Sequence, residues 1–300
     1  VWVGGHFALT KHSPSPRPRG RLIDPDRYRP GRIPTQRLDV NGEPKSLLEI
    51  DDGTVLAGLY PSTDVIAVHP DTLEIRTLGT IGHEQMRPMA MAWDADRRTA
   101  LVATTASQQI HTGALTFVDV ESGDMDVRNF LPGQNTRALT VDGDFAYLAG
   151  DVYAEGTGEH PLEVASVAEI DLRTREVTRI FEPREWASLE SVVVLDRILY
   201  VMSRRPSGHW YALDLETEEV VASGEMGGYG TLAVHLGTVY TWDKWTDSIQ
   251  ALTLEDGGGR RTVYEHVPDG WFNNPDFGFV RRIRGAWGAH GTDLAWFPLT

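Results

Sequence analysis

The chain has 300 residues, of which 41% are hydrophobic and 9% aromatic, and this composition suits a globular protein with a hydrophobic core rather than a disordered chain. A net charge of −15 opposes binding to nucleic acid and to anionic membranes, and no apolar run approaches the roughly 18–20 residues that span a bilayer. Because the chain has no cysteine, disulfides, thiolate zinc sites and cysteine catalysis are excluded, while the cellular compartment stays open.

A strand pattern rich in aromatic and small residues recurs along the chain. Its copies begin, in chain order, at Val1 (VWVGGH), Val55 (VLAGLY), Ala100 (ALVATT), Ala146 (AYLAGD), Leu199 (LYVMSR), Val239 (VYTWDK) and Ala286 (AWGAHG). Each copy leads to a further strand with a tight turn, and these turns are marked by Asp24, His69, Asp119, Asp171, Asp214, Thr253 and Phe297. Neighbouring copies are roughly 40 to 50 residues apart, which is the length of one propeller blade.

An inner strand of small or β-branched residues precedes most copies, as close packing around a central channel requires. These strands begin at Lys45, Pro88, Ala138, Ser191, Thr231 and Phe277. No stretch has a long apolar period of 3.6 residues, so we expect almost no helix. We therefore predict an all-β fold, a single seven-bladed β-propeller over residues 1–300 with four-stranded antiparallel blades. The expected blades are approximately 1–40, 43–80, 86–132, 136–182, 187–226, 229–267 and 276–300.

The repeat is incomplete at both ends. The chain opens at Val1 on the second strand of a blade and closes at Thr300, where a turn to the fourth strand is expected. We expect the first blade to lack its inner strand, the last blade to lack its outer strand, and the chain to belong to a longer polypeptide with further domains. Valine is not a natural initiator, so a removed leader is a further expectation, and it favours an extracytoplasmic or secreted location.

The connections between second and third strands are long, whereas the turns expected on the opposite face are short. The long connections begin at His6, Thr104 and Asp151. Long loops on one face of a rigid scaffold usually carry the function. The sequence therefore predicts a site where these loops emerge, at the mouth of the central channel.

Residues at the ends of second strands and the starts of inner strands are expected at this mouth. They mix cations, proton-transfer groups and aromatic surfaces, which suits an anionic, ring-shaped ligand such as a sugar acid or an oligosaccharide. The predicted substrate-binding residues are His6, Lys45, Tyr60, Arg87, Asn135, Arg137, Trp186, Arg204, Lys244, Trp245 and His290. The alternative is that arginine and histidine side chains at these positions only bridge neighbouring blades and bind water.

Two other kinds of site are weighed against this one. Aspartates in the repeated turns could be calcium ligands, but capping of their own turns is the preferred interpretation. His111, His160 and His209 lie in loops without metal-ligand spacing and are expected to be solvated. The chain has no G-x-S-x-G elbow, no Walker loop and no H-E-x-x-H helix.

Two phrases, GLYPSTDVIAVHPDTLEIRTLG from Gly58 and EQMRPMAMAWD from Glu84, resemble bacterial seven-bladed propellers of the YVTN and quinoprotein-like type. Within that group the chain resembles propellers that act as polysaccharide lyases on uronic-acid linkages. The resemblance implies β-elimination, in which Arg87 or Arg137 would neutralise the C5 carboxylate of the sugar. His83 and Tyr229 are the candidates for the base that takes the C5 proton and the acid that protonates the departing O4.

Two further functions stay open. A non-catalytic propeller could bind a glycan or a protein as one domain of a larger chain. A hydrolase or lactonase with a divalent cation in the channel would need converging carboxylates, for which only Asp151, Glu84 and Glu190 are available, and it ranks last. No cofactor is predicted.

Overall fold

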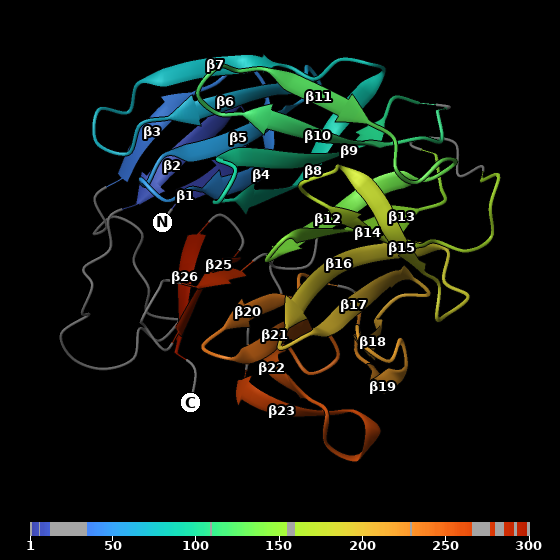
Figure 1. The fold of residues 1–300 in the computed structure, drawn as a ribbon. Helices are drawn as coiled ribbons and strands as arrows, with labels where there is room; N and C mark the ends of the chain where they lie inside the picture. The colour runs from blue at the N-terminus through green and yellow to red at the C-terminus, as the bar shows by residue number, and fades with distance from the viewer. Residues whose placement is uncertain are drawn as a thin grey trace. The chain divides into compact units, whose positions relative to one another are not determined.

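The computed structural model describes residues 2–5, 7–12, 35–108, 110–154, 160–228, 230–265, 277–279, 285–290 and 293–298. The chain divides into two compact units, one built from residues 2–10 and 36–192 (unit 2) and the other mainly from residues 193–300 (unit 1). In Figure 1, consecutive strands of each unit lie side by side. The expectation of an all-β fold is confirmed.

Unit 2 contains three consecutive four-stranded groups, in which each strand pairs antiparallel with the next along the chain. The first group is β4 (Glu43–Glu49), β5 (Val55–Tyr60), β6 (Asp64–Val68) and β7 (Ile75–Thr80). The second is β8 (Gln85–Asp94), β9 (Thr99–Ala106), β10 (Ala114–Asp119) and β11 (Met125–Arg128). The third is β12 (Asn135–Asp142), β13 (Phe145–Asp151), β14 (Val167–Asp171) and β15 (Glu176–Phe181).

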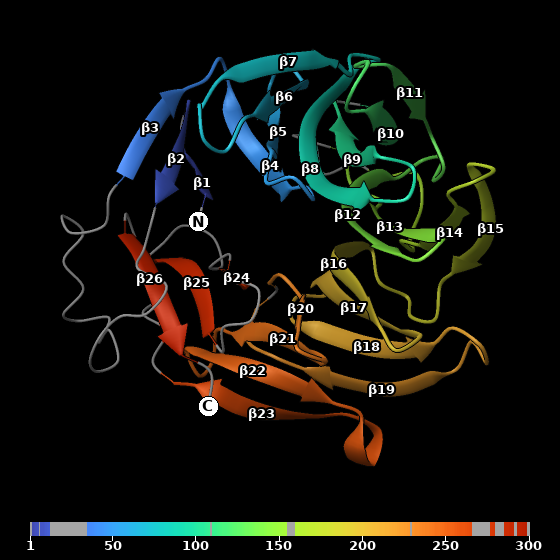
Figure 2. The ribbon, with the colours of Figure 1, turned by 60° about the vertical axis from the view of Figure 1, so that its left-hand side comes forward.

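Unit 1 continues the same pattern, as Figure 2 shows. One group is β16 (Ser188–Leu195), which begins in unit 2, with β17 (Ile198–Arg205), β18 (His209–Asp214) and β19 (Val220–Glu225). The next is β20 (Ala233–His235), β21 (Thr238–Asp243), β22 (Ser248–Thr253) and β23 (Gly259–Tyr264), with a 3-10 turn at Glu255–Gly257. Three strands follow: β24 (Phe277–Phe279), β25 (Gly285–His290) and β26 (Asp293–Pro298).

The first three strands correct one prediction. The segment that begins at His6 was expected to be a long loop, but Ala8–His12 forms β2, which lies between β1 (Trp2–Gly5) and β3 (Thr35–Asp39). The apolar pair Ala8 and Leu9 explains the strand, because both side chains are buried. The turn residue predicted at Asp24 falls outside the described residues.

The core of unit 2 lies between neighbouring four-stranded groups. Strand β9 is buried along its whole length. Its alternate side chains point to opposite faces of the strand, and both faces are covered. Val102 joins the cluster that contains Leu56, whereas Leu101 joins the cluster that contains Leu148. Each fully buried leucine of this kind contributes roughly 1.5–3 kcal/mol relative to an exposed one. The two-sided burial explains why these strands read as continuous apolar runs.

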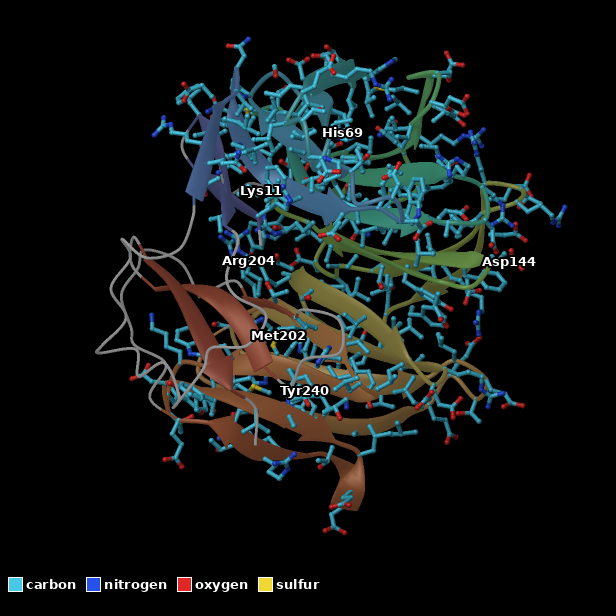
Figure 3. All side chains as sticks on the ribbon, turned by 90° about the vertical axis from the view of Figure 1, so that its left-hand side faces the viewer. Lys11, His69, Asp144, Met202, Arg204 and Tyr240 are labelled. Atoms are coloured by element: carbon cyan, nitrogen blue, oxygen red, sulfur yellow. The ribbon has the colours of Figure 1, made fainter. Side chains whose placement is uncertain are left out.

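Unit 1 is built in the same way around larger side chains. Met202 of β17 packs in a cluster with Trp210, while Tyr240 of β21 packs in another with Trp242. Figure 3 labels Met202 and Tyr240. Val239, adjacent to Tyr240, belongs to the Met202 cluster. The two faces of β21 therefore serve two different clusters, as the two faces of β9 do. Within the described part of the chain, no helix is long and apolar enough to span a membrane.

Side chains in the repeated turns cap those turns, as preferred from the sequence. The Oδ1 atom of Asp171 accepts hydrogen bonds from the backbone N–H groups of Arg173 and Thr174, both at 2.8 Å. Asp119 and Asp214 accept the equivalent pairs, and the Nδ1 atom of His69 accepts two in its own turn. The capping interpretation is therefore confirmed for Asp119, Asp171 and Asp214.

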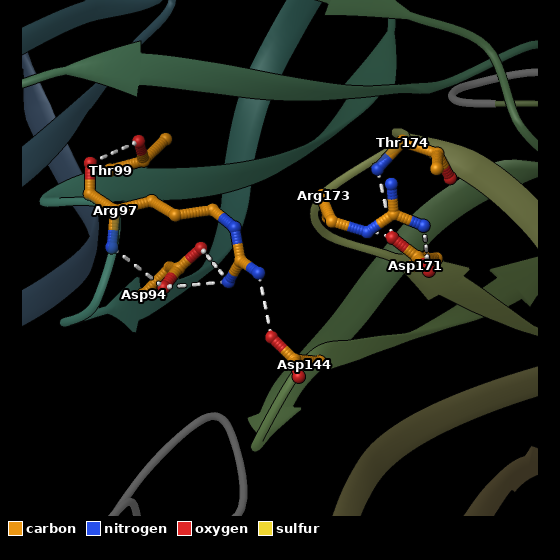
Figure 4. A network of polar contacts seen from close by, with 7 residues as sticks. All are labelled: Asp94, Arg97, Thr99, Asp144, Asp171, Arg173 and Thr174. Atoms are coloured by element: carbon orange, nitrogen blue, oxygen red, sulfur yellow. Dashed lines mark hydrogen bonds and ion pairs between the residues drawn. The ribbon is translucent and has the colours of Figure 1, made fainter.

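An ion-pair network ties the second group of unit 2 to the third. The guanidinium of Arg97 lies 3.2 Å from Asp94 Oδ2 within its own turn, and 2.6 Å from Asp144 Oδ1 in the turn between β12 and β13. Figure 4 shows this network beside the Asp171 cap. One arginine thus links two consecutive strand groups.

Candidate functional site

Two cations lie over the ring of Tyr60, the last residue of β5. The Nζ atom of Lys45 is 5.5 Å from the centre of its ring, and the Cζ atom of Arg87 is 5.0 Å from the same centre. Cations at such distances are attracted to the face of an aromatic ring. Lys45, Tyr60 and Arg87 come from β4, β5 and β8, so the structure brings three predicted site residues together within unit 2. We call them the Tyr60 cluster.

A β-bulge positions Lys45 in this cluster. Glu43 pairs with Tyr60 and Pro44 with Leu59, but the register then shifts so that Ser46 pairs with Gly58. The extra residue is Lys45, and a bulge re-aims the side chain that it carries. The ammonium lies 2.6 Å from Glu43 Oε1. The cluster therefore offers both donors and an acceptor around the ring.

The same position of the repeat carries a cation in three consecutive inner strands. Each cation lies two residues after the residue that pairs with the end of the second strand, and the register shifts either at the cation or at the residue before it. The three residues are Lys45, Arg87 and Arg137. Strand β8 contacts both β4 and β12, so the three cations come from adjoining strands.

Two carboxylates lie beside Arg137. Its Nη2 atom is 3.2 Å from Glu190 Oε2, and its Nε atom is 3.7 Å from Asp151 Oδ2. The Arg137 and Asp151 side chains are 9% and 4% exposed. Two carboxylates in a largely buried setting balance the guanidinium charge.

Asn135 is only 1% exposed, and both polar atoms of its side-chain amide form hydrogen bonds with backbone groups. Its Oδ1 atom accepts a hydrogen bond from Ala106 N, and its Nδ2 atom donates to Tyr153 O, both at 2.8 Å. This side chain ties β9 to the loop after β13. These contacts give Asn135 a role in holding the loop, and they do not favour its contact with a ligand.

Two other predicted residues of unit 2 lie beside these elements. His83 is exposed and lies two residues before the start of β8. Trp186 is half-buried, and its carbonyl oxygen accepts a hydrogen bond from Ala165 N at 2.7 Å. Trp186 therefore holds the end of the long connection between β13 and β14.

In unit 1, an Asp-x-aromatic turn carries two predicted residues. Asp243 is fully buried; it pairs with Arg260, and its Oδ1 atom accepts hydrogen bonds from Trp245 N at 2.8 Å and Gly227 N at 3.0 Å. The turn leaves Lys244 exposed and Trp245 67% exposed. A rigid turn that exposes an indole provides a flat surface on which a ring can stack.

The same device occurs in unit 2, where Asp151 Oδ1 accepts a hydrogen bond from Tyr153 N at 3.0 Å. Sequence reasoning missed it, although the phrases DVY from Asp151 and DKW from Asp243 occupy the same repeat position. It also missed Glu43, the partner of Lys45. An alternating Glu-x-Lys pair on one strand was the available signal, since residues i and i+2 share a face.

The structure describes the remaining predicted site residues to different extents. Arg204 lies in β17 of unit 1 and is half-buried. For His290, the structure describes only the backbone, at the end of β25. His6 and Tyr229 lie outside the described residues. Ligand binding by any of these residues stays a prediction.

Comparisons with known proteins identify a fold but no family. No protein-family model matches the chain, and no curated protein matches it. Solved structures do match, among them the Dos1 propeller, with 10% identity, a TM-score of 0.64, and coverage of 87% of this chain and 70% of that one.

Two other matches are the nidogen/laminin complex and the hydrazine synthase of Kuenenia stuttgartiensis. The first has 13% identity and a TM-score of 0.59, and the match covers 84% of this chain and 88% of that one. The second has 16% identity and a TM-score of 0.58, with coverage of 82% and 73%. At such identities the likeness shows the fold alone, and the chain is a β-propeller. The resemblance to YVTN-type propellers and uronate lyases stays a hypothesis.

Proposed function

We propose that this propeller binds an acidic oligosaccharide through the Tyr60 cluster. The observation that carries the proposal is that Lys45 and Arg87 both lie over the ring of Tyr60. In a protein of net charge −15, two cations held over one half-buried aromatic ring favour a ligand that carries negative charge.

The mixture of groups supports a sugar rather than a simple anion. A phenol ring offers a flat apolar face with a polar end, and a guanidinium matches the geometry of a carboxylate. Glu43, paired with Lys45, adds a carboxylate that can accept hydrogen bonds from hydroxyl groups. Binding sites for small ligands combine such surfaces with a few placed polar groups.

Titration calorimetry with a tetramer of galacturonic acid tests the proposal. Arg87→Ala and Tyr60→Ala should each weaken binding by a factor of ten or more, since each removes a charged or stacking contact of roughly 1–3 kcal/mol. The matched control is Arg173→Ala, because Arg173 is exposed in the turn after β14 and its loss changes the net charge equally. No binding by the unmodified protein, or equal weakening by the control, would refute the proposal.

Cleavage of a uronate linkage is the second candidate. The observation that favours it is that His83, an exposed proton-transfer group, lies four residues before Arg87 in the chain. Arg87 would neutralise the C5 carboxylate and His83 would take the C5 proton. The C4–O4 bond would then break as a C4–C5 double bond forms, and Tyr229 would protonate the departing O4. The product would absorb in the ultraviolet. Absence of that absorbance across a panel of uronate polymers would leave binding as the function.

A further inference from the structure

Three consecutive residues before β8 adopt a left-handed backbone conformation. The φ angles of Gly82, His83 and Glu84 are 63°, 50° and 60°. Glycine adopts this region without cost, but the β-carbon of any other residue crowds the following carbonyl oxygen there. The other run of three described, Asp256–Gly258, has glycine at two positions. Among the described residues, Asp196 and Arg197, in the turn between β16 and β17, are the other adjacent pair of non-glycine residues with positive φ, at 51° and 64°.

One end of this left-handed turn is anchored to the loop that follows Tyr60. The N–H group of Gly82 donates to Thr63 Oγ1 at 3.1 Å, and the N–H group of Ile81 donates to Thr63 O at 3.1 Å. Thr63 is 1% exposed. The turn is therefore fixed to the same loop that begins at the Tyr60 cluster.

The other end is anchored by Gln85, the first residue of β8. Its N–H group closes the turn on Gly82 O at 2.9 Å, and its side-chain amide donates to His83 O at 3.2 Å. The carbonyl oxygen of Glu84 accepts a hydrogen bond from Ser107 N at 2.7 Å. The surroundings thus over-determine a conformation that the two residues would not choose, and such strain gathers at functional sites.

The strained backbone turns its two polar side chains to solvent. His83 and Glu84 are both exposed, and among the described residues no hydrogen bond or ion pair joins either side chain to a partner. Packing within the protein therefore does not account for their outward placement. Strand β8 continues from this turn to Arg87, whose Cζ atom lies 5.0 Å from the centre of the Tyr60 ring.

We propose that the Gly82–Glu84 turn is the hydroxyl-recognition element of the sugar site, a role that rests on the proposed function. The imidazole of His83 and the carboxylate of Glu84 bind neighbouring hydroxyl groups of the sugar unit whose carboxylate is held by Arg87. A neutral imidazole can both donate and accept, and a carboxylate accepts from two hydroxyls. Because the turn is fixed before the ligand arrives, little ordering remains to oppose binding.

Glycine substitution separates this role from a structural one. His83→Gly and Glu84→Gly relieve the crowding and should each raise Tm, by about 1 to 3 °C, while they weaken binding of the galacturonate tetramer at least tenfold. His83→Ala and Glu84→Ala should weaken binding as much without raising Tm. Glu218→Gly is the control, because Glu218 is exposed with a φ of 59° in the turn between β18 and β19, and it should raise Tm without changing affinity.

The outcomes distinguish the two proposals. If Arg87→Ala loses binding while both glycine variants bind as the unmodified protein does, the hydroxyl-recognition role is wrong and the proposed function stands. If the glycine variants lower Tm and also weaken binding, the turn has only a structural role. If the unmodified protein binds no acidic sugar, both proposals fall.

Discussion

The guanidinium of Arg76, on the outer strand β7, donates a hydrogen bond to the carbonyl oxygen of Val120 at 2.6 Å, in the turn of the following four-stranded group. Arg128 repeats this contact from β11 by donating to the carbonyl oxygen of Arg175 at 3.1 Å. Each contact links the outer strand of one group to the β-turn of the next. Together the two arginines join three consecutive groups of unit 2.

Removing the Arg76 link should therefore destabilise unit 2. We expect Arg76→Ala to lower the free energy of unfolding by about 1 to 2 kcal/mol, since a charged donor leaves a partly buried carbonyl oxygen without its bond. Arg173→Ala, at an exposed position, should change it by less than about 0.5 kcal/mol. Urea denaturation measures both. Equal effects would show that only net charge matters.

The capping aspartates should make stability depend on acid pH. The pKa of each is lowered from 3.8, chiefly by a turn N–H group, in the pairs Asp119 with Ser122, Asp171 with Thr174 and Asp214 with Glu216. A lowered folded-state pKa stabilises the fold above the unfolded value, and this contribution is lost as pH falls through the folded pKa. Replacing all three by asparagine should flatten the fall of Tm below about pH 4. An unchanged pH profile would contradict the prediction.

Glu169 should contribute more to the stability of unit 2 than either of the hydroxyl groups that donate to it. Its carboxylate, 3% exposed, accepts hydrogen bonds from Tyr147 at 3.0 Å, from Thr178 at 2.6 Å and from Arg179 at 2.9 Å. Burial alone would raise the pKa of Glu169, but the Arg179 and Thr178 hydrogen bonds outweigh it and lower the pKa. Glu169→Ala should cost about 2 to 4 kcal/mol, because it strands a partly buried guanidinium.

The matched variant is Tyr147→Phe, which removes a single donor from Glu169. We expect it to cost about 1 kcal/mol, since the carboxylate keeps its other partners. Chemical denaturation of both variants checks the ranking. A larger loss for Tyr147→Phe than for Glu169→Ala would show that the carboxylate is not the centre of this network.

Gly113 should tolerate no side chain. A β-carbon there would collide with the carbonyl oxygen of Thr104 and would lie 2.5 Å from Thr136 N, both of them backbone atoms that cannot move aside. Gly113→Ala should cost about 3 kcal/mol or more. Gly143→Ala, where a β-carbon meets nothing within 4 Å and φ is 57°, should cost only about 1 kcal/mol. Thermal unfolding compares the two, and similar losses would refute the steric argument.

Two tryptophans three residues apart should behave in opposite ways. Trp245 is 67% exposed and Trp242 is 2% exposed. Trp245→Ala should leave Tm nearly unchanged, whereas Trp242→Ala should lower the free energy of unfolding by about 3 to 5 kcal/mol. Thermal and urea unfolding of both variants measures the two effects. Similar losses of stability would contradict the assignment of Trp242 to the core of unit 1.

The strand pattern was legible in the sequence because it is set locally. Strands such as β9 and β13 start within a residue or two of the phrases that predicted them, since burial on both faces produces continuous apolar runs. Turn capping by Asp171 was legible for the same reason, because the donors lie two and three residues along the chain. The strand at Ala8–His12 was missed because a polar, proline-rich segment follows it.

Composition and periodicity alone determined the all-β repeat and the group of side chains from which a site would be drawn. Only the tertiary structure decided how their charges are used: Arg137 is balanced by Glu190, 53 positions along the chain, whereas Arg87 lies against Tyr60. It also decided that His83 and Glu84 adopt a left-handed turn. Both outcomes depend on bulges and on hydrogen bonds between separate strands, and such long-range contacts leave no periodic trace in the order of residues.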